Sequence, residues 1–227
     1  MAKVYLSGCK WRARFPEASE WFTEQVVAHG YAEKGTDACC RDMWDKLGEE
    51  DTAVLICNNC MAMIEEASDC NIENIWTIID QDPDFELPDY SGLTVGVQDC
   101  GRSYNRTDVQ DAVRSILHKM NIETVELPDA REKSRFCGMS FLKAVPPVDA
   151  KLAPWRYVED AEKRGIFAGL DEEAAMKALK EHCDAINVDV VCDYSFACDA
   201  GLDMGGQKAV NLIELVSGKF RNGSSLD

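Results

Sequence analysis

Short apolar runs alternate with longer amphipathic segments along the chain. Residues 3–6 are an apolar run that breaks at Ser7-Gly8-Cys9, a pattern typical of a buried strand that ends in a loop. An amphipathic helix is predicted from Pro16 to Gly30, because proline favours a helix start and glycine a helix end. Residues 52–56 predict a second strand, and residues 75–79 form the last apolar stretch of this half.

The same succession begins again near residue 93. Residues 93–97 predict a strand that breaks just before Cys100, and residues 107–120 predict an amphipathic helix. A further helix is predicted to be capped by Asp171 and to run to Cys183. A strand is predicted at residues 187–191, and residues 208–216 form the closing apolar stretch. The order of strand, cysteine, helix and closing segment therefore occurs twice.

Two copies of a strand–helix unit favour an α/β fold with mostly parallel strands. We expect two pseudo-repeated, Rossmann-like βα units, residues 1–90 and 91–227, with cysteines on the loops at the carboxyl ends of the strands. The second unit carries an insertion around residues 139–169 that the first lacks. The insertion is either a lid or partner-docking surface, or a structural wrap over the sheet.

Composition narrows the possible partners. The 227 residues include 24 Lys and Arg against 41 Asp and Glu, which gives a formal net charge of −17. Such a charge repels phosphate backbones and anionic lipids, so we expect no nucleic-acid partner. No apolar run approaches the roughly 20 residues of a membrane span. The first residues have neither a basic nor an apolar leader region, which predicts a cytoplasmic protein.

Cysteine is the unusual residue of this chain. There are eleven cysteines, an odd number in a long chain without a predicted leader, so a disulfide framework is not expected. Free thiols at loop positions favour metal or redox chemistry. Cys70 and Cys183 fit the simpler interpretation of small buried hydrophobic residues.

The other cysteines fall into one group for each unit. Loops that follow parallel strands gather at one edge of a sheet, so the cysteines of each unit are expected to converge there. The first group is Cys9, Cys39, Cys40, Cys57 and Cys60. The second group is Cys100, Cys137, Cys192 and Cys198.

Three kinds of site compete for these thiols. A structural zinc site needs only four thiolates. A thioredoxin-like dithiol would use Cys57 and Cys60 and leave the other cysteines unexplained. An iron–sulfur cluster in each unit would use all of them. The adjacent Cys39 and Cys40 suit a cluster of several irons better than one tetrahedral zinc, because neighbouring side chains diverge.

The cysteine pattern resembles that of the cysteine-rich CCG-domain family, which includes a component of heterodisulfide reductase and the lactate-utilisation iron–sulfur protein. The family pattern is a cysteine, then Cys-Cys-Gly, then Cys-x-x-Cys, present twice. The first copy reads Cys9, Cys39-Cys40-Arg41 and Cys57-Asn58-Asn59-Cys60, and the second reads Cys100, Phe136-Cys137-Gly138, Cys192 and Cys198. The chain departs from the pattern at Arg41, which replaces a glycine, and at Phe136, which replaces a cysteine.

The resemblance implies a [4Fe–4S] cluster of the non-cubane type on the first group. The second group keeps at most four cysteines, enough for an ordinary cubane cluster, or is a site that has lost its cluster. The implied function is an electron-transfer or disulfide-reducing subunit of a heterodisulfide reductase-like complex, an oxidoreductase with flavin or iron–sulfur partner subunits. A substrate thiol or disulfide is expected near Cys9 or Cys40, the candidate catalytic residues.

The alternative function is a scaffold or interaction protein that holds zinc, or no metal, through degenerate sites. Asp99 and Arg102 flank Cys100 and are candidates to tune its site by hydrogen bonding.

Overall fold

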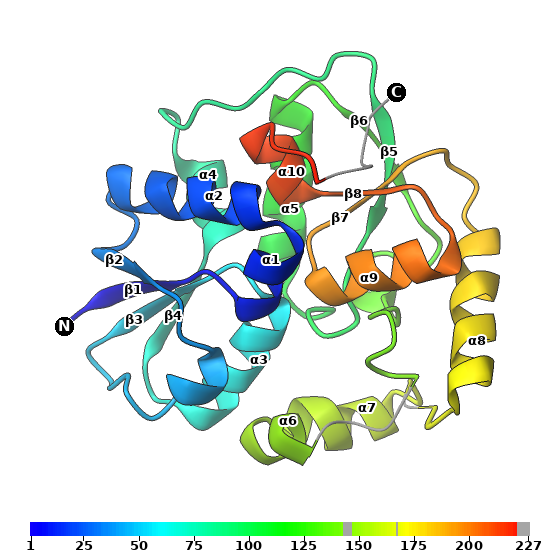
Figure 1. The fold of residues 1–227 in the computed structure, drawn as a ribbon, viewed down its shortest axis with the longest axis horizontal. Helices are drawn as coiled ribbons and strands as arrows, with labels where there is room; N and C mark the ends of the chain where they lie inside the picture. Colours follow the sequence, from blue (N-terminus) through cyan, green and yellow to red (C-terminus); the bar gives the residue numbers. More distant parts are fainter. Residues whose placement is uncertain (143–146, 167, 222–227) are drawn as a thin grey trace.

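The computed structural model describes residues 1–142, 147–166 and 168–221. The first sheet has the order β2-β1-β3-β4 and the second the order β6-β5-β7-β8, with every pairing parallel (Figure 1). The strands of the first sheet are β1 (Lys3–Leu6), β2 (Lys34–Thr36), β3 (Thr52–Leu55) and β4 (Asn71–Asn74). Those of the second sheet are β5 (Thr94–Gln98), β6 (Glu123–Glu126), β7 (Val191–Asp193) and β8 (Ala209–Asn211). The predicted α/β class with parallel, repeated units is confirmed.

Helices connect the strands in both units. The first unit contains α1 (Cys9–Arg14), α2 (Pro16–Ala28), the 3-10 helix η1 (Cys40–Asp42), α3 (Asn58–Ala67) and α4 (Ile75–Gln81). The second contains α5 (Thr107–Lys119), the 3-10 helix η2 (Arg131–Lys133), α6 (Pro147–Leu152), the π-helical turn η3 (Trp155–Glu159), α7 (Asp160–Lys163), α8 (Glu172–Asp184), α9 (Phe196–Gly205) and α10 (Leu212–Ser217). The predicted cap at Asp171 is confirmed, since its side chain accepts a hydrogen bond from the Ala174 amide at 2.9 Å.

The central strands are apolar on both faces, as expected for parallel sheets covered by helices. Ala53, Val54 and Leu55 of β3 are completely buried. The largest apolar cluster contains residues of both units, because α4 packs against α5 and α10 packs against α2. The two units therefore share one core.

The insertion around residues 139–169 contacts both units: Arg164 donates to the Gly101 carbonyl of the second unit at 2.8 Å, and α6 packs against α3 of the first. Residues 143–146 and 167 of the insertion are outside the described part of the chain. In Figure 1, α6 and α7 run below α3 and α9. The Glu66 carboxylate at the end of α3 accepts hydrogen bonds from the backbone amides of Trp155 and Arg156, at 2.8 and 2.9 Å. These bonds satisfy free amides at the start of η3 and attach the insertion to the first unit.

A network of buried charges lies where the two units meet. Asp199 in α9 is fully buried and pairs with Arg14 of the first unit and with Arg221 after α10. Nearby, Asp193 accepts hydrogen bonds at Oδ1 from the Ser195 amide and the Asn211 side chain, whereas its buried Oδ2 has no partner among the described residues. Burial, and then the charge of Asp199, raises the pKa of Asp193 well above its usual value.

The raised pKa of Asp193 predicts a pH-dependent stability. The unfolded chain loses this proton first, near pH 4, so stability falls as pH rises from there through the higher folded pKa. Asp193→Asn should remove this loss and raise the free energy of unfolding by about 1 kcal/mol at pH 8, with a smaller gain at pH 5. Urea unfolding at the two pH values measures the effect. Asp199→Asn, which removes the buried carboxylate that Arg14 and Arg221 share, should instead destabilise the protein by about 3 kcal/mol.

Candidate metal centres at the strand ends

The five cysteines of the first unit line one cavity. Cys9 begins α1 directly beyond β1, while Cys57 precedes α3 beyond β3, and Cys60 lies in the first turn of that helix. Cys39 and Cys40 arrive on the connection between β2 and β3. The cavity has a volume of about 360 Å³, and all five residues line it. The expected convergence of the first group is therefore present in the structure.

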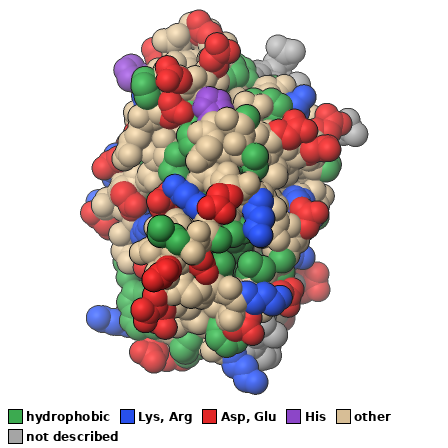
Figure 2. Space-filling model, turned by 90° about the vertical axis from the view of Figure 1, so that its left-hand side faces the viewer, with side chains coloured by type: hydrophobic (Ala, Val, Ile, Leu, Met, Phe, Trp, Pro, Cys, Tyr) green, Lys and Arg blue, Asp and Glu red, His purple; other side chains and the backbone are tan. Residues whose placement is uncertain are grey.

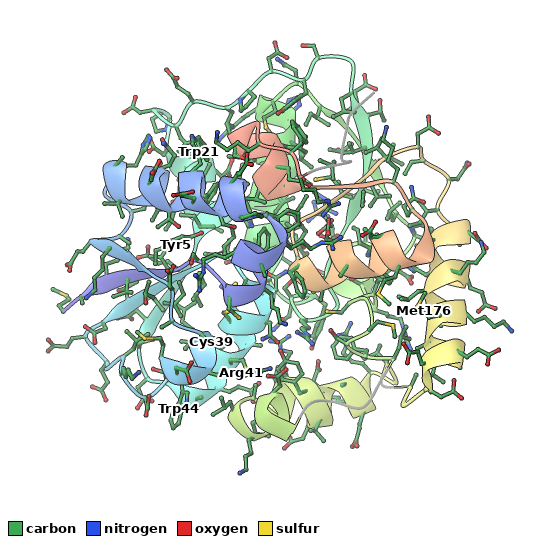
Figure 3. All side chains as sticks on the ribbon, viewed as in Figure 1. Tyr5, Trp21, Cys39, Arg41, Trp44 and Met176 are labelled. Atoms are coloured by element: carbon green, nitrogen blue, oxygen red, sulfur yellow. The ribbon has the colours of Figure 1, made fainter. Side chains whose placement is uncertain are left out.

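The thiols of this first group surround the cavity instead of meeting at a point. The Sγ atoms of Cys9 and Cys39 lie 3.7 Å apart, and Cys60 interacts with both Cys40 and Cys57. Cys40 and Cys60 are buried, whereas Cys9, Cys39 and Cys57 are partly exposed. Figure 3 shows Cys39 and Arg41 in the first unit, with Arg41 on the side that faces helix α6. The exposed thiols give the cavity direct access to solvent.

Neighbouring thiols divide the first group into easily ionised and protonated members. Hydrogen bonding to Cys60 is the largest effect that lowers the pKa of Cys57, to about 7, and it also lowers the pKa of Cys40. The same bonds raise the pKa of Cys60. Burial raises the pKa of Cys39 to about 11. Thiolate is the form that binds soft metals, so Cys40 and Cys57 are prepared for ligation.

The cysteines of the second unit form a smaller and tighter group. The sulfur atoms of Cys100, Cys137 and Cys198 all lie within 4.8 Å of one another, and the Sγ atoms of Cys100 and Cys137 are 3.5 Å apart. At most 1% of each side chain is exposed. Among the described residues, no other set of three or more His, Cys, Asp or Glu side chains brings its ligand atoms this close together. These three thiols could bind a metal ion or cluster.

A glycine contact brings two of these cysteines together. Gly138 has φ +52°, and a Cβ at this position would lie 2.1 Å from the carbonyl oxygen of Ala197 in α9. Gly201, one turn further along α9, faces Gly138 in the same close contact. Only residues without a side chain permit this approach of loop and helix, which places Cys137 beside Cys198. The Cys137-Gly138 sequence thus has a packing role as well as a chemical one.

Hydrogen bonds also differentiate the thiols of the second group. Bonds to Cys137 and then Cys198 lower the pKa of Cys100 well below the ordinary value, despite complete burial. The bond to Cys100 raises the pKa of Cys137 to about 12, and burial raises that of Cys198. Of the three thiols, Cys100 is therefore the one whose ionised form is favoured.

Cys192 lies apart from the second group. The predicted strand at residues 187–191 is formed further along, as Val191–Asp193, so Cys192 is inside β7 and not on the loop after it. Successive strand residues face opposite sides of a sheet. Val191 belongs to the apolar cluster around the three thiols, and Cys192 belongs to the main core on the other side. Its placement corrects the expectation that Cys192 joins the second group, which contains three cysteines.

The two departures from the family pattern have structural explanations. Arg41 donates from Nε to Asp149 of α6 at 3.0 Å, so it joins the first unit to the insertion. Phe136 stacks on His182 with a centroid distance of 4.0 Å and an interplanar angle of 9°. A ring pair therefore occupies the side of the second group where the pattern has a cysteine.

Arg102 lies between the two groups of thiols. It lines the cavity of the first group, donates to Asn59 Oδ1 at 2.5 Å, and stands over the ring of Tyr157 at 4.7 Å. Burial by itself lowers the pKa of Arg102, but the charges of Cys137 and its neighbours raise it above the ordinary value. The sequence predicts an action of Arg102 on Cys100 alone. The contact of Arg102 with Asn59 of the first unit has no signal in the sequence.

The Asp99 carboxylate, expected to form hydrogen bonds at the Cys100 site, binds other residues. It accepts hydrogen bonds from Arg114 at 2.7 Å, from the Tyr194 hydroxyl at 2.7 Å and from the Arg131 amide at 2.6 Å. These bonds fix the segment that leads from β6 toward Cys137. Asp99 thus supports the loop, and a hydrogen bond to the Cys100 thiol is not among its contacts.

Comparison with known proteins adds no relative. No family model, curated protein or solved structure matches the chain. Within the described residues, no helix has both the length and the apolar character needed to cross a membrane.

The close contact of Gly138 with α9 predicts how substitutions at glycine positions affect stability. Gly138→Ala should lower the free energy of unfolding by about 3 kcal/mol, because the new methyl group overlaps α9 in a conformation that alanine disfavours. Gly165 also has a positive φ but open space around its Cβ position, so Gly165→Ala should cost only about 1 kcal/mol. Chemical unfolding of both variants makes the comparison. Equal costs would show that crowding at Gly138 is unimportant.

Proposed function

We propose that this protein is an iron–sulfur redox protein, an electron-transfer or disulfide-reducing subunit of a heterodisulfide reductase-like complex. The observation that carries the proposal is the arrangement of Cys9, Cys39, Cys40, Cys57 and Cys60 around one accessible cavity. Membership in the CCG-domain family is part of this proposal and rests on the cysteine pattern of the chain.

The spacing of the five thiols favours a cluster over a single ion. Sulfur ligands of one tetrahedral zinc lie about 2.3 Å from the ion and therefore about 3.8 Å from one another. No three described thiols of the first group lie within 4.8 Å of one another, so they do not surround one point closely. Thiols spread around a cavity suit a [4Fe–4S] cluster, whose irons are separated in space.

When bound, such a cluster supplies one-electron chemistry. Cys39, Cys40, Cys57 and Cys60 would hold it, with Cys9 as a fifth ligand or as the thiol nearest a bound substrate. Reduction of a disulfide to two thiols consumes two electrons and two protons. The electrons would come from a flavin or iron–sulfur partner, and the net charge of −17 favours a partner with basic side chains. On the face drawn in Figure 2, acidic and basic side chains are interspersed.

The second group has a more limited role in this proposal. Three buried thiols at close spacing can hold one zinc ion or a cluster that lacks one protein ligand. Its three cysteines are at most 1% exposed, although Cys137 also lines a neighbouring cavity of about 300 Å³. Its tight spacing also favours the competing function, a zinc-binding structural protein, if zinc alone is found.

Metal analysis of protein purified without oxygen tests the proposed function. We expect about four irons per chain on the first group. Cys9→Ser and Cys60→Ser should each lower this iron content, whereas Cys70→Ser should leave it unchanged because Cys70 is buried outside both groups. One zinc and no iron would overturn the redox function in favour of a structural one.

A matched pair of variants tests the composition of the second group. Cys198→Ser removes a thiol that lies within 4.8 Å of two others and should abolish metal binding there. Cys192→Ser changes an equally buried thiol on the opposite face of β7 and should retain the metal. Elemental analysis of both variants, on a Cys60→Ser background, isolates the second group. Loss of metal from Cys192→Ser alone would reverse the assignment.

A further inference from the structure

The cavity of the first group is shared by both units. Arg102 and Met139 reach it from the loops of the second unit, and Ser195, Phe196 and Ala197 reach it from the start of α9. Arg41 and Lys10 of the first unit complete its basic lining. Asp149 is the acidic residue of the lining and is already paired with Arg41. In a chain of net charge −17, the charged side chains of this lining are Lys10, Arg41 and Arg102 against Asp149.

Arg102 is the unusual member of this lining. Its side chain is 8% exposed, yet among the described residues it has no carboxylate within ion-pair distance, in contrast to Arg14, Arg41 and Arg114. Its Nη1 donates to the neutral Asn59 amide, and its buried Nε has no hydrogen-bond partner. Burial of a cation without a carboxylate partner is unfavourable unless neighbouring thiols are ionised, so this position is suited to a negative charge.

The residues that line the cavity beside Arg102 restrict which anionic ligands fit there. Phe196, Ala197 and Met139 form an apolar surface, whereas the hydroxyl-bearing Ser140 and Ser195 add hydrogen-bonding groups. A volume of about 360 Å³ lies within the range of small-molecule sites. The partly exposed thiols of Cys9, Cys39 and Cys57 line the same space. The occupant is therefore small, partly apolar and anionic, with sulfur as its natural reacting atom.

We infer that Arg102 is the anchor of an anion subsite, which binds the carboxylate-type group of a small organic thiol or disulfide and directs its sulfur toward the cysteines. The inference rests on the proposed function and extends it by naming a substrate class. Binding of the anion itself requires no metal. It depends on the Arg102 guanidinium, the Ser140 and Ser195 hydroxyls and the apolar lining residues named above.

The rate of thiol–disulfide exchange with a small reagent measures whether the cavity prefers an anionic reagent to a neutral one. A cysteine thiolate attacks one sulfur of a disulfide reagent, the reagent S–S bond breaks, and one half leaves as a thiolate while a mixed disulfide forms. The exchange needs no external oxidant or reductant. Since Cys70, Cys183 and Cys192 are buried, the fastest phase reports the partly exposed thiols of the cavity.

Two reagents separate anion binding from thiol reactivity. The dianionic 5,5′-dithiobis(2-nitrobenzoate) and the uncharged 4,4′-dithiodipyridine are compared on the same full-length, reduced protein, so metal loading cancels in the ratio of rate constants. Arg102→Gln should lower the ratio of anionic to neutral rate about tenfold, and Arg102→Lys should lower it less. Arg135→Gln changes the net charge equally at an exposed position and should leave the ratio unchanged.

The outcomes decide the inference independently of the cluster. If Arg102→Gln slows both reagents by one factor, Arg102 acts only on thiol ionisation and the anion subsite is refuted. If the variant does not fold, benzoate competition on the unaltered protein replaces it: benzoate should slow the anionic reagent and not the neutral one. An unchanged anionic rate under benzoate would refute the subsite. A chain without iron but with a large ratio would contradict the proposed function and support the subsite.

Discussion

Parallel pairing of the central strands is the constraint on which both groups of thiols depend. Leu6 pairs with Leu55, so Cys9 and Cys57 leave β1 and β3 at the same level of the first sheet. Gln98 pairs with Asp193 in the second sheet, and Cys100 and Cys198 follow from that shared edge. An antiparallel arrangement would send consecutive loops to opposite edges and separate these cysteines. The topology thus brings together thiols that are distant in sequence.

The buried charges of the molecule follow from the way the two sheets meet. Asp199 holds Arg14 and Arg221 at the junction, where opposite charges compensate one another. Arg102 lies between the two units, where its side chain contacts the Asn59 amide and the rings of Tyr157 and Phe141. A folded protein tolerates such a cation when nearby thiolates or a ligand provide the missing charge. Negative charge in the cavity would therefore compensate Arg102 at the junction of the two units.

Much of this architecture can be predicted from periodicity, and the failures have local causes. The first apolar run predicts a strand at the observed bounds, Lys3–Leu6, because it ends at a clear break. Helix α1 is not predicted, because its six residues, Cys9–Arg14, are too few to show a helical period. The predicted place of Cys192 is wrong because a cysteine inside a strand has the same apolar pattern as one just beyond it. The pairing of Arg41 with Asp149 joins residues over a hundred positions apart, beyond the reach of any local pattern.

The two groups of thiols differ in how easily a soluble compound can reach them. In the first group, three thiols reach an open cavity, and the others line its buried side. In the second, complete burial and the stacked rings of Phe136 and His182 close the position at which the pattern has a further cysteine. Such a buried group can hold a metal or pass electrons, and its Cys137 also lines a separate cavity of about 300 Å³, together with Phe136 and His182. The first group, with three partly exposed cysteines around a cavity that Arg102 also lines, is the more accessible of the two to an external thiol or disulfide.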